Sequence, residues 1–152
     1  MHKELHWKKG AFSNTYKISY HKEFIGSLST EVFRSNATGQ IEEDKYVFKS
    51  QGLLSRTIHV FEYISKQKIA SIKVSAWGRK AQIKTKDKQY LWNFKNFWQT
   101  KWTIADQSKT YISGTHSSLL SKGNLIYRDA DNFLILVSIY IIDYLKRRNS
   151  AG

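Results

Sequence analysis

Aromatic and basic side chains are interleaved between Tyr90 and Trp102. This stretch contains six aromatic residues, with Lys95 and Lys101 among them. Such a mixture can stack the bases of a single-stranded nucleic acid while the lysines bind its phosphates. It also suits the interface between a membrane and water. Phe97 and Trp98 fall in a predicted turn region, so they are the two aromatic side chains that we expect to be exposed.

The other aromatic residues of this stretch follow a strand pattern. Tyr90, Trp92 and Phe94 stand at every second position. Strict alternation is typical of a strand that has one buried face. We therefore expect these three rings in the protein core.

Basic residues are densest just before this stretch. Four of the lysines there share one parity, whereas Ala81 and Ile83 take the other, so on a strand the lysines would all point outward. A basic stripe of this kind can bind the phosphates of a lipid head group or of a nucleic acid backbone. It can equally protect an edge strand from pairing with other chains. The candidate residues for an anionic ligand are Arg79, Lys80, Lys84, Lys86 and Lys88, together with Lys95 and Lys101.

The net charge is concentrated in the same region. The 152 residues carry a formal charge of +13, and residues 66–109 hold eleven Lys and Arg against two Asp. A positive field of this size attracts nucleic acid, anionic lipid or acidic protein. The alternative is a charged surface that only keeps the protein in solution.

No residue pattern indicates catalysis. The chain has no cysteine, and its five histidines lack the spacing of metal ligands. Neither a nucleophile elbow nor a phosphate-cradling glycine loop is present. The sequence therefore predicts a protein that is not an enzyme and that has no metal site and no cofactor.

Most of the chain alternates at period two, which predicts about ten short strands in an antiparallel meander or barrel. Proline is absent, so closure of the sheet or edge lysines must protect the strand edges. The alternating sets include Tyr16, Ile18 and Tyr20; Tyr46 and Phe48; Ile58 and Val60; Ile72 and Val74; and Trp102 and Ile104. Turn residues stand between them at 36–39, 51–52, 65–67, 86–88 and 106–108.

The pattern changes after Tyr127. Residues 133–142 are hydrophobic apart from Ser138. A helix over residues 132–146 would be roughly 22 Å long at 1.5 Å per residue. It is too short for a membrane span and contains Asp143, and no turn residue divides it into two strands. Because it is apolar on nearly every side, we expect protein to surround it; an amphitropic or tail-anchor helix is the alternative.

A strand, acidic turn and strand unit, a hairpin, and a second copy of the unit follow one another within residues 12–146, ahead of the apolar terminal helix. The phrases are Val60-Phe61-Glu62 with Ile69-Ala70-Ser71-Ile72, Trp77 with Ala81-Gln82-Ile83, Tyr90 with Trp92, and Trp102-Thr103-Ile104-Ala105-Asp106. In the order of these phrases the chain resembles the tubby C-terminal-like superfamily, which includes tubby domains, phospholipid scramblases and LURP-one-related proteins. The resemblance implies a closed β-barrel of about twelve strands around a hydrophobic C-terminal helix, and a phosphoinositide or other phospholipid ligand.

The sequence thus predicts a single all-β domain over residues 1–152. We expect barrel strands over about 5–127, a central helix over about 132–146 and a short basic tail at 147–152. The polar segment Met1–Gly10 lacks the apolar core of a signal peptide, so we expect a cytoplasmic protein, peripheral at the membrane. The favoured function is binding of phospholipid head groups, with single-stranded nucleic acid binding and a purely structural or protein-interaction role as alternatives. Nothing in the sequence indicates an oligomeric state.

Overall fold

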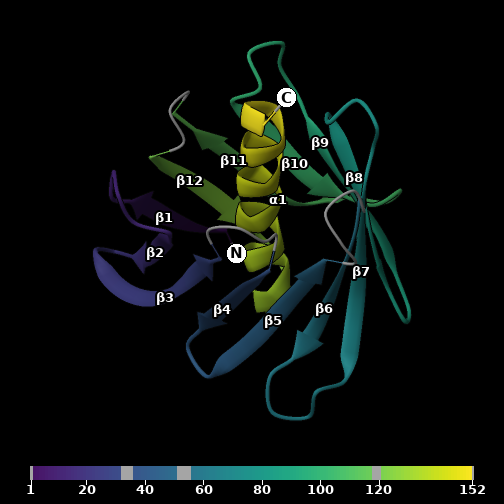
Figure 1. The fold of residues 1–152 in the computed structure, drawn as a ribbon, viewed down its shortest axis with the longest axis horizontal. Coiled ribbons are helices and arrows are strands. Elements are labelled where there is room, and N and C mark those ends of the chain that lie inside the picture. Colours follow the sequence, from purple (N-terminus) through teal and green to yellow (C-terminus); the bar gives the residue numbers. More distant parts are fainter. Residues whose placement is uncertain (1, 32–35, 51–55, 118–120, 152) are drawn as a thin grey trace.

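Twelve antiparallel strands form a closed barrel around one helix (Figure 1). The computed structural model describes residues 2–31, 36–50, 56–117 and 121–151. Strands that follow one another in the chain are neighbours, and pairing of β1 with β12 closes the ring. The predicted closed barrel of about 10–12 strands with a hydrophobic C-terminal helix is therefore confirmed. The strands are β1 (Lys3–Lys9), β2 (Thr15–Tyr20), β3 (Glu23–Thr30), β4 (Ala37–Ile41), β5 (Asp44–Ser50), β6 (Thr57–Glu62), β7 (Lys68–Val74), β8 (Lys80–Thr85), β9 (Gln89–Phe94), β10 (Lys101–Ala105), β11 (Thr110–His116) and β12 (Lys122–Tyr127), and the helix is α1 (Asn132–Ala151).

Apolar and polar residues that alternate in the sequence point alternately into the barrel and out to solvent. Tyr90, Trp92 and Phe94 are buried, as predicted, and Leu91 between them is partly exposed. Ala81 and Ile83 point inward, while Lys80 and Lys84 point outward. The period-two pattern therefore identified the buried face of these strands correctly.

One predicted turn is wrong. Residues 36–39 were expected to form a turn, but β4 begins at Ala37, and Ala37, Gly39 and Ile41 face the core. Small residues are used here because the helix approaches closely: a Cβ on Gly39 would lie 2.9 Å from Leu136 Cδ2. The turn predicted at Gln51-Gly52 lies outside the described residues.

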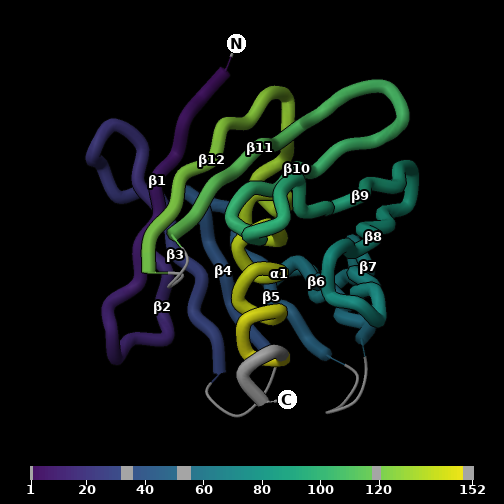
Figure 2. Tube along the Cα trace, turned by 90° about the horizontal axis from the view of Figure 1, so that it is seen from above, coloured from purple at the N-terminus to yellow at the C-terminus, as the bar shows by residue number. Residues whose placement is uncertain are grey.

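The helix occupies the barrel interior, and strands surround it in both views (Figures 1 and 2). All residues from Phe133 to Asp143 are buried. Large rings line the wall formed by β9, β10, β11, β12 and β1, where Trp92 and Trp102 stack at 6.1 Å between centroids. The Trp102 ring covers Gly114 so closely that a Cβ there would meet it at 2.1 Å. The barrel is thus filled by side chains and helix.

We expect the substitution Gly39→Val to loosen the contact between β4 and the helix. The added carbons would meet the side-chain ends of Leu136 and Leu28 at 2.9 to 3.0 Å. Overpacking of a closed core costs about 1–3 kcal/mol. Urea unfolding followed by circular dichroism measures the loss, and Gly10→Val, in a loop where the nearest atom lies at 3.6 Å, is the control. Equal stability of the two variants would contradict the close approach.

The helix is longer than predicted. It continues from the expected end at Lys146 to Ala151, so Arg147 and Arg148 belong to the helix and not to a tail. Hydrogen bonds from these arginines to loop carbonyls support the extra turns beyond the apolar segment. Among the described residues, no helix has the length and apolarity needed to cross a bilayer.

Candidate functional site

The two ends of the barrel differ in charge. At one end, toward the top of Figure 1, the helix terminates and the loops 75–79 and 95–100 project. The loop 10–14 joins β1 to β2 at the same end of the strands. We call this end the basic rim. The helix begins at the other end, where Asn132 Nδ2 donates a hydrogen bond to Asp44 Oδ2 at 2.8 Å. We call that end the mixed rim.

Nearly all of the net positive charge lies toward the basic rim. All twelve Asp and Glu residues belong to the described part of the chain, and only Glu31 and Asp143 lie on the basic half. The ten acidic residues toward the mixed rim are Glu4, Glu23, Glu42, Glu43, Asp44, Glu62, Asp87, Asp106, Asp129 and Asp131. The basic residues there are Lys3, Lys22, Lys45, Lys66, Lys68, Lys84, Lys86, Lys88, Lys109 and Arg128. The described basic residues toward the basic rim are Lys8, Lys9, Lys17, Lys49, Arg56, Lys73, Arg79, Lys80, Lys95, Lys101, Lys122, Lys146, Arg147 and Arg148. The mixed rim is therefore close to neutral.

This arrangement divides the predicted anionic-ligand residues into two groups. Arg79, Lys80, Lys95 and Lys101 come together at the basic rim because β8 and β10 begin there and β9 ends there. Lys84 stands further along the outer face of β8, while Lys86 and Lys88 lie in the next turn, at the mixed rim. Six residues of strand span about 20 Å, so one small ligand cannot contact both groups.

Three large aromatic side chains project from two neighbouring loops of the basic rim. Trp77 lies between β7 and β8, and Phe97 and Trp98 lie between β9 and β10. Their exposed fractions are 90%, 82% and 79%. The exposure predicted for Phe97 and Trp98 is confirmed. Trp77 was not identified as exposed, although the adjacent Gly78, which has a φ of 69°, is a turn signal.

The loop that carries Phe97 and Trp98 is held by its own hydrogen bonds. Asn96 Oδ1 accepts from the backbone N–H groups of Thr100 and Lys101, each at 3.0 Å, and Asn96 Nδ2 donates to Thr100 Oγ1 at 2.8 Å. These bonds fix the backbone on both sides of the two rings. The loop thus presents the rings to solvent in a defined conformation.

Arg79 joins the two aromatic loops. Its Nη2 donates to the carbonyl oxygen of Asn96 at 3.1 Å, and its guanidinium carbon lies 5.9 Å from the centre of the Phe94 ring. Beneath the same loop, His116 hydrogen-bonds the Gln99 backbone, and burial lowers the pKa of His116 to about 4. His116 is therefore neutral at pH 7 and adds no charge to the basic rim.

A shallow groove runs over the outer face of β10, β11 and β12 beside the aromatic loop. Its volume is about 290 Å³. Lys95 and Lys101 flank it. Two of the polar side chains that line it are already engaged, because the Thr115 hydroxyl donates to Asn124 Oδ1 at 2.8 Å and Asn124 Nδ2 donates to Glu4 Oε1 at 3.2 Å. The two lysine ammonium groups are therefore the groups that can receive a phosphate here.

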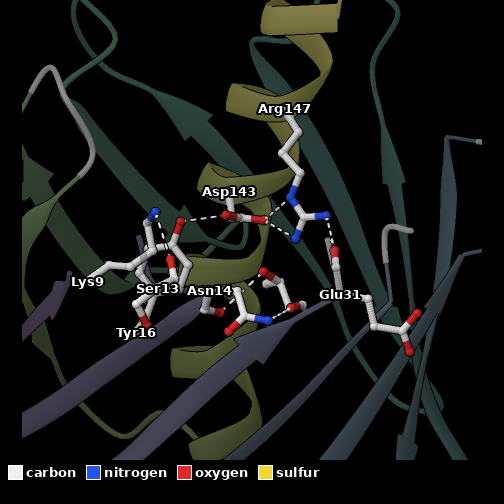
Figure 3. Close-up of polar contacts among 8 residues, drawn as sticks. Lys9, Ser13, Asn14, Tyr16, Glu31, Asp143 and Arg147 are labelled. Carbon is white, nitrogen blue, oxygen red and sulfur yellow. Dashed lines mark hydrogen bonds and ion pairs between the residues drawn. The ribbon is translucent and has the colours of Figure 1, made fainter. Parts of the chain in front are cut away.

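A buried ionic contact connects the helix to the barrel wall just below the basic rim (Figure 3). The phenol of Tyr16 donates to Asp143 Oδ1 at 2.5 Å, and Arg147 Nε and Nη2 each lie 2.7 Å from Asp143 Oδ2. Arg147 Nη1 also donates to the carbonyl oxygen of Glu31 at 2.7 Å. Burial and the adjacent Asp143 carboxylate raise the pKa of Tyr16, which keeps its proton and remains the donor.

Within the described ranges, no group of three or more His, Asp or Glu side chains at either rim could hold a metal ion. Asp106, at the mixed rim, has its pKa held well below the usual value by hydrogen bonds from Tyr111, Ser108 and the Lys109 backbone. That carboxylate stabilises its own turn.

Comparisons of the chain with protein-family models, with curated proteins and with solved structures find no match.

Proposed function

We propose that the protein is a non-enzymatic binding domain that docks its basic rim onto anionic phospholipid surfaces. The observation that carries the proposal is that the chain's net positive charge and exposed aromatic rings, among them Trp77, Phe97 and Trp98, lie at the same end of the barrel. In this arrangement Trp77, Phe97 and Trp98 enter the interfacial layer while the surrounding lysines contact lipid phosphates. The groove beside Lys95 and Lys101 receives one head group.

The expected energies of the charged and the aromatic contacts are consistent with binding to a membrane surface. A lysine or arginine near an anionic bilayer contributes about 1 kcal/mol. Burying a large apolar side chain contributes about 1.5–3 kcal/mol more. The resemblance to the tubby C-terminal-like superfamily leads to the same ligand class, and a cytoplasmic protein that is peripheral at the membrane is the corresponding location.

Single-stranded nucleic acid is the less favoured ligand for this surface. The rings of Phe97 and Trp98 meet edge to face, at 83° and 5.4 Å between centroids. Bases stack on the free faces of aromatic rings. In a T-shaped pair the edge of one ring covers part of a face of the other, which leaves less ring surface for stacking, whereas a bilayer interface accepts rings in any orientation.

Reversing the charge of two lysines at the basic rim is expected to abolish most of the binding to anionic vesicles. The double substitution Lys95→Glu and Lys101→Glu removes about 2 kcal/mol of attraction and adds repulsion, so the partition coefficient should fall roughly thirty-fold or more. Sedimentation with vesicles of phosphatidylcholine, with and without phosphatidylserine, measures it.

The matched control carries the same charge change at the mixed rim. The double substitution Lys86→Glu and Lys88→Glu should lower binding much less, because these side chains lie at the opposite end of the barrel. Equal losses in the two variants would contradict docking by the basic rim. Tight binding of wild-type protein to an oligo-dT strand without binding to phosphatidylserine vesicles would favour nucleic acid instead.

A further inference from the structure

The last turns of α1 end within the basic rim, yet the arginines there are already engaged by protein. Arg147 contacts Asp143 and the Glu31 carbonyl, as described above. Arg148 Nη1 donates to the carbonyl oxygen of Ser75 at 3.1 Å, and its Nη2 donates to that of Ala76 at 2.7 Å. Two donors of the Arg148 guanidinium therefore hold backbone oxygens on another element.

The two carbonyl oxygens belong to the loop that presents Trp77. Ser75 and Ala76 directly precede Trp77, and the N–H of Gly78 donates back to the Ser75 carbonyl oxygen at 3.1 Å. Gly78 takes a φ of 69°, and a Cβ on it would lie 3.6 Å from Leu145 Cδ2 of the helix. The loop thus lies over the end of α1, and Arg148 fixes its backbone from below.

The same fixation extends to the second aromatic loop. Arg79 ends the Trp77 loop and donates to the Asn96 carbonyl oxygen at 3.1 Å. A continuous series of contacts therefore leads from the helix through the Trp77 loop to the loop of Phe97 and Trp98. Rings held in their bound positions before contact lose less conformational entropy on binding.

We propose that Arg148 is a positioning residue of the basic rim, which fixes Trp77 through the carbonyls of Ser75 and Ala76 and makes no contact with lipid. The proposal rests on the proposed function. The planar fork of a guanidinium can reach two successive carbonyl oxygens, whereas a lysine ammonium is a compact point charge on a flexible stem. Charge and positioning at Arg148 can therefore be separated by one substitution.

The test compares Arg148→Lys with wild type in the full chain. Arg148→Lys keeps the charge but loses the fork, so binding to phosphatidylcholine–phosphatidylserine vesicles should fall at least about threefold. In ¹⁵N-labelled protein without vesicles, the heteronuclear NOE of the Trp77 indole should fall too, because the loop moves on the ps–ns timescale. The melting temperature should change little.

A double-substitution cycle tests whether Arg148 affects vesicle binding through Trp77. If Arg148 acts through Trp77, the substitution Arg148→Lys should cause no further loss in a Trp77→Ala background. Lys86→Ala, at the mixed rim, is the control for a single basic residue and should leave both readouts unchanged. Wild-type binding by Arg148→Lys, an unchanged Trp77 NOE, or a full loss in the Trp77→Ala background would each overturn the positioning role. If wild-type protein binds no anionic vesicle, the proposed function fails, and the NOE alone decides whether Arg148 holds the loop.

Discussion

The substitution Ile139→Asp is expected to prevent folding of the protein. Ile139 lies at the middle of the buried part of α1 and has no exposed surface. An aspartate there would be enclosed in the hydrophobic core, one helical turn from the Asp143 carboxylate. A carboxylate in such surroundings must be protonated or lose its hydration at a cost of several kcal/mol. The smaller aspartate also leaves a cavity where the isoleucine side chain packed. Since whole domains are stable by only about 5–15 kcal/mol, the two effects together remove most of the stability.

Soluble expression and the far-ultraviolet circular dichroism of the variant measure this effect. Ile64→Asp introduces the same charge at a side chain that is 86% exposed, and it should change stability by no more than about 0.5 kcal/mol. Ile139→Val keeps the position apolar and should cost about 0.5–1.5 kcal/mol. A soluble Ile139→Asp protein with a cooperative unfolding transition would mean that the helix is not enclosed.

The barrel and the helix could be predicted because their signals depend on burial, which the sequence records directly. Strands such as β9 show strict alternation because one face contacts the core and the other contacts water. The helix shows no alternation because it meets protein on all sides. Each signal is local, extending over ten or fewer residues. The pattern alone left an open meander and a barrel as alternatives, and the closed ring was implied by the resemblance.

Features that depend on a partner far away in the chain could not be predicted. Gly39 gave a turn signal, yet it is small because Leu136 packs against it. The helix extends past Lys146, where Arg148 donates hydrogen bonds to the carbonyl oxygens of Ser75 and Ala76, which are distant in sequence.

The separation of the candidate lysines into two groups, one at each rim, also depends on residues that are distant in the chain. Parity placed Lys80 and Lys84 on one outer face, and the turn predicted at 86–88 already separated Lys86 and Lys88 from that strand. That this turn lies at the opposite end of the barrel from Lys95 and Lys101 follows only from the order and direction of the strands.

The second large effect is expected at Asp143. It is the only charged residue among the apolar residues 133–145, and it is only 6% exposed. The substitution Asp143→Ala leaves the Tyr16 phenol without its acceptor and Arg147 without its counter-ion. Removal of one partner from a fully buried ion pair costs about 3–5 kcal/mol, and the loss here should lie toward the lower value because the Arg147 side chain is 30% exposed. Urea unfolding of Asp143→Ala, Tyr16→Phe and the double variant should show a coupling of about 0.5–3 kcal/mol between the two sites.

The triple variant Tyr16→Phe, Asp143→Leu and Arg147→Met separates stability from specificity at this contact. Replacement of all three members of a buried ionic contact by apolar groups can leave stability nearly unchanged. An apolar helix inside an apolar barrel would then have no polar contact from Asp143 to set its depth and rotation. We therefore expect a cooperative unfolding transition near that of wild type, but doubled amide resonances for α1 and for the Trp77 loop that Arg148 holds. A single set of resonances at wild-type positions would show that side-chain packing alone sets the helix register.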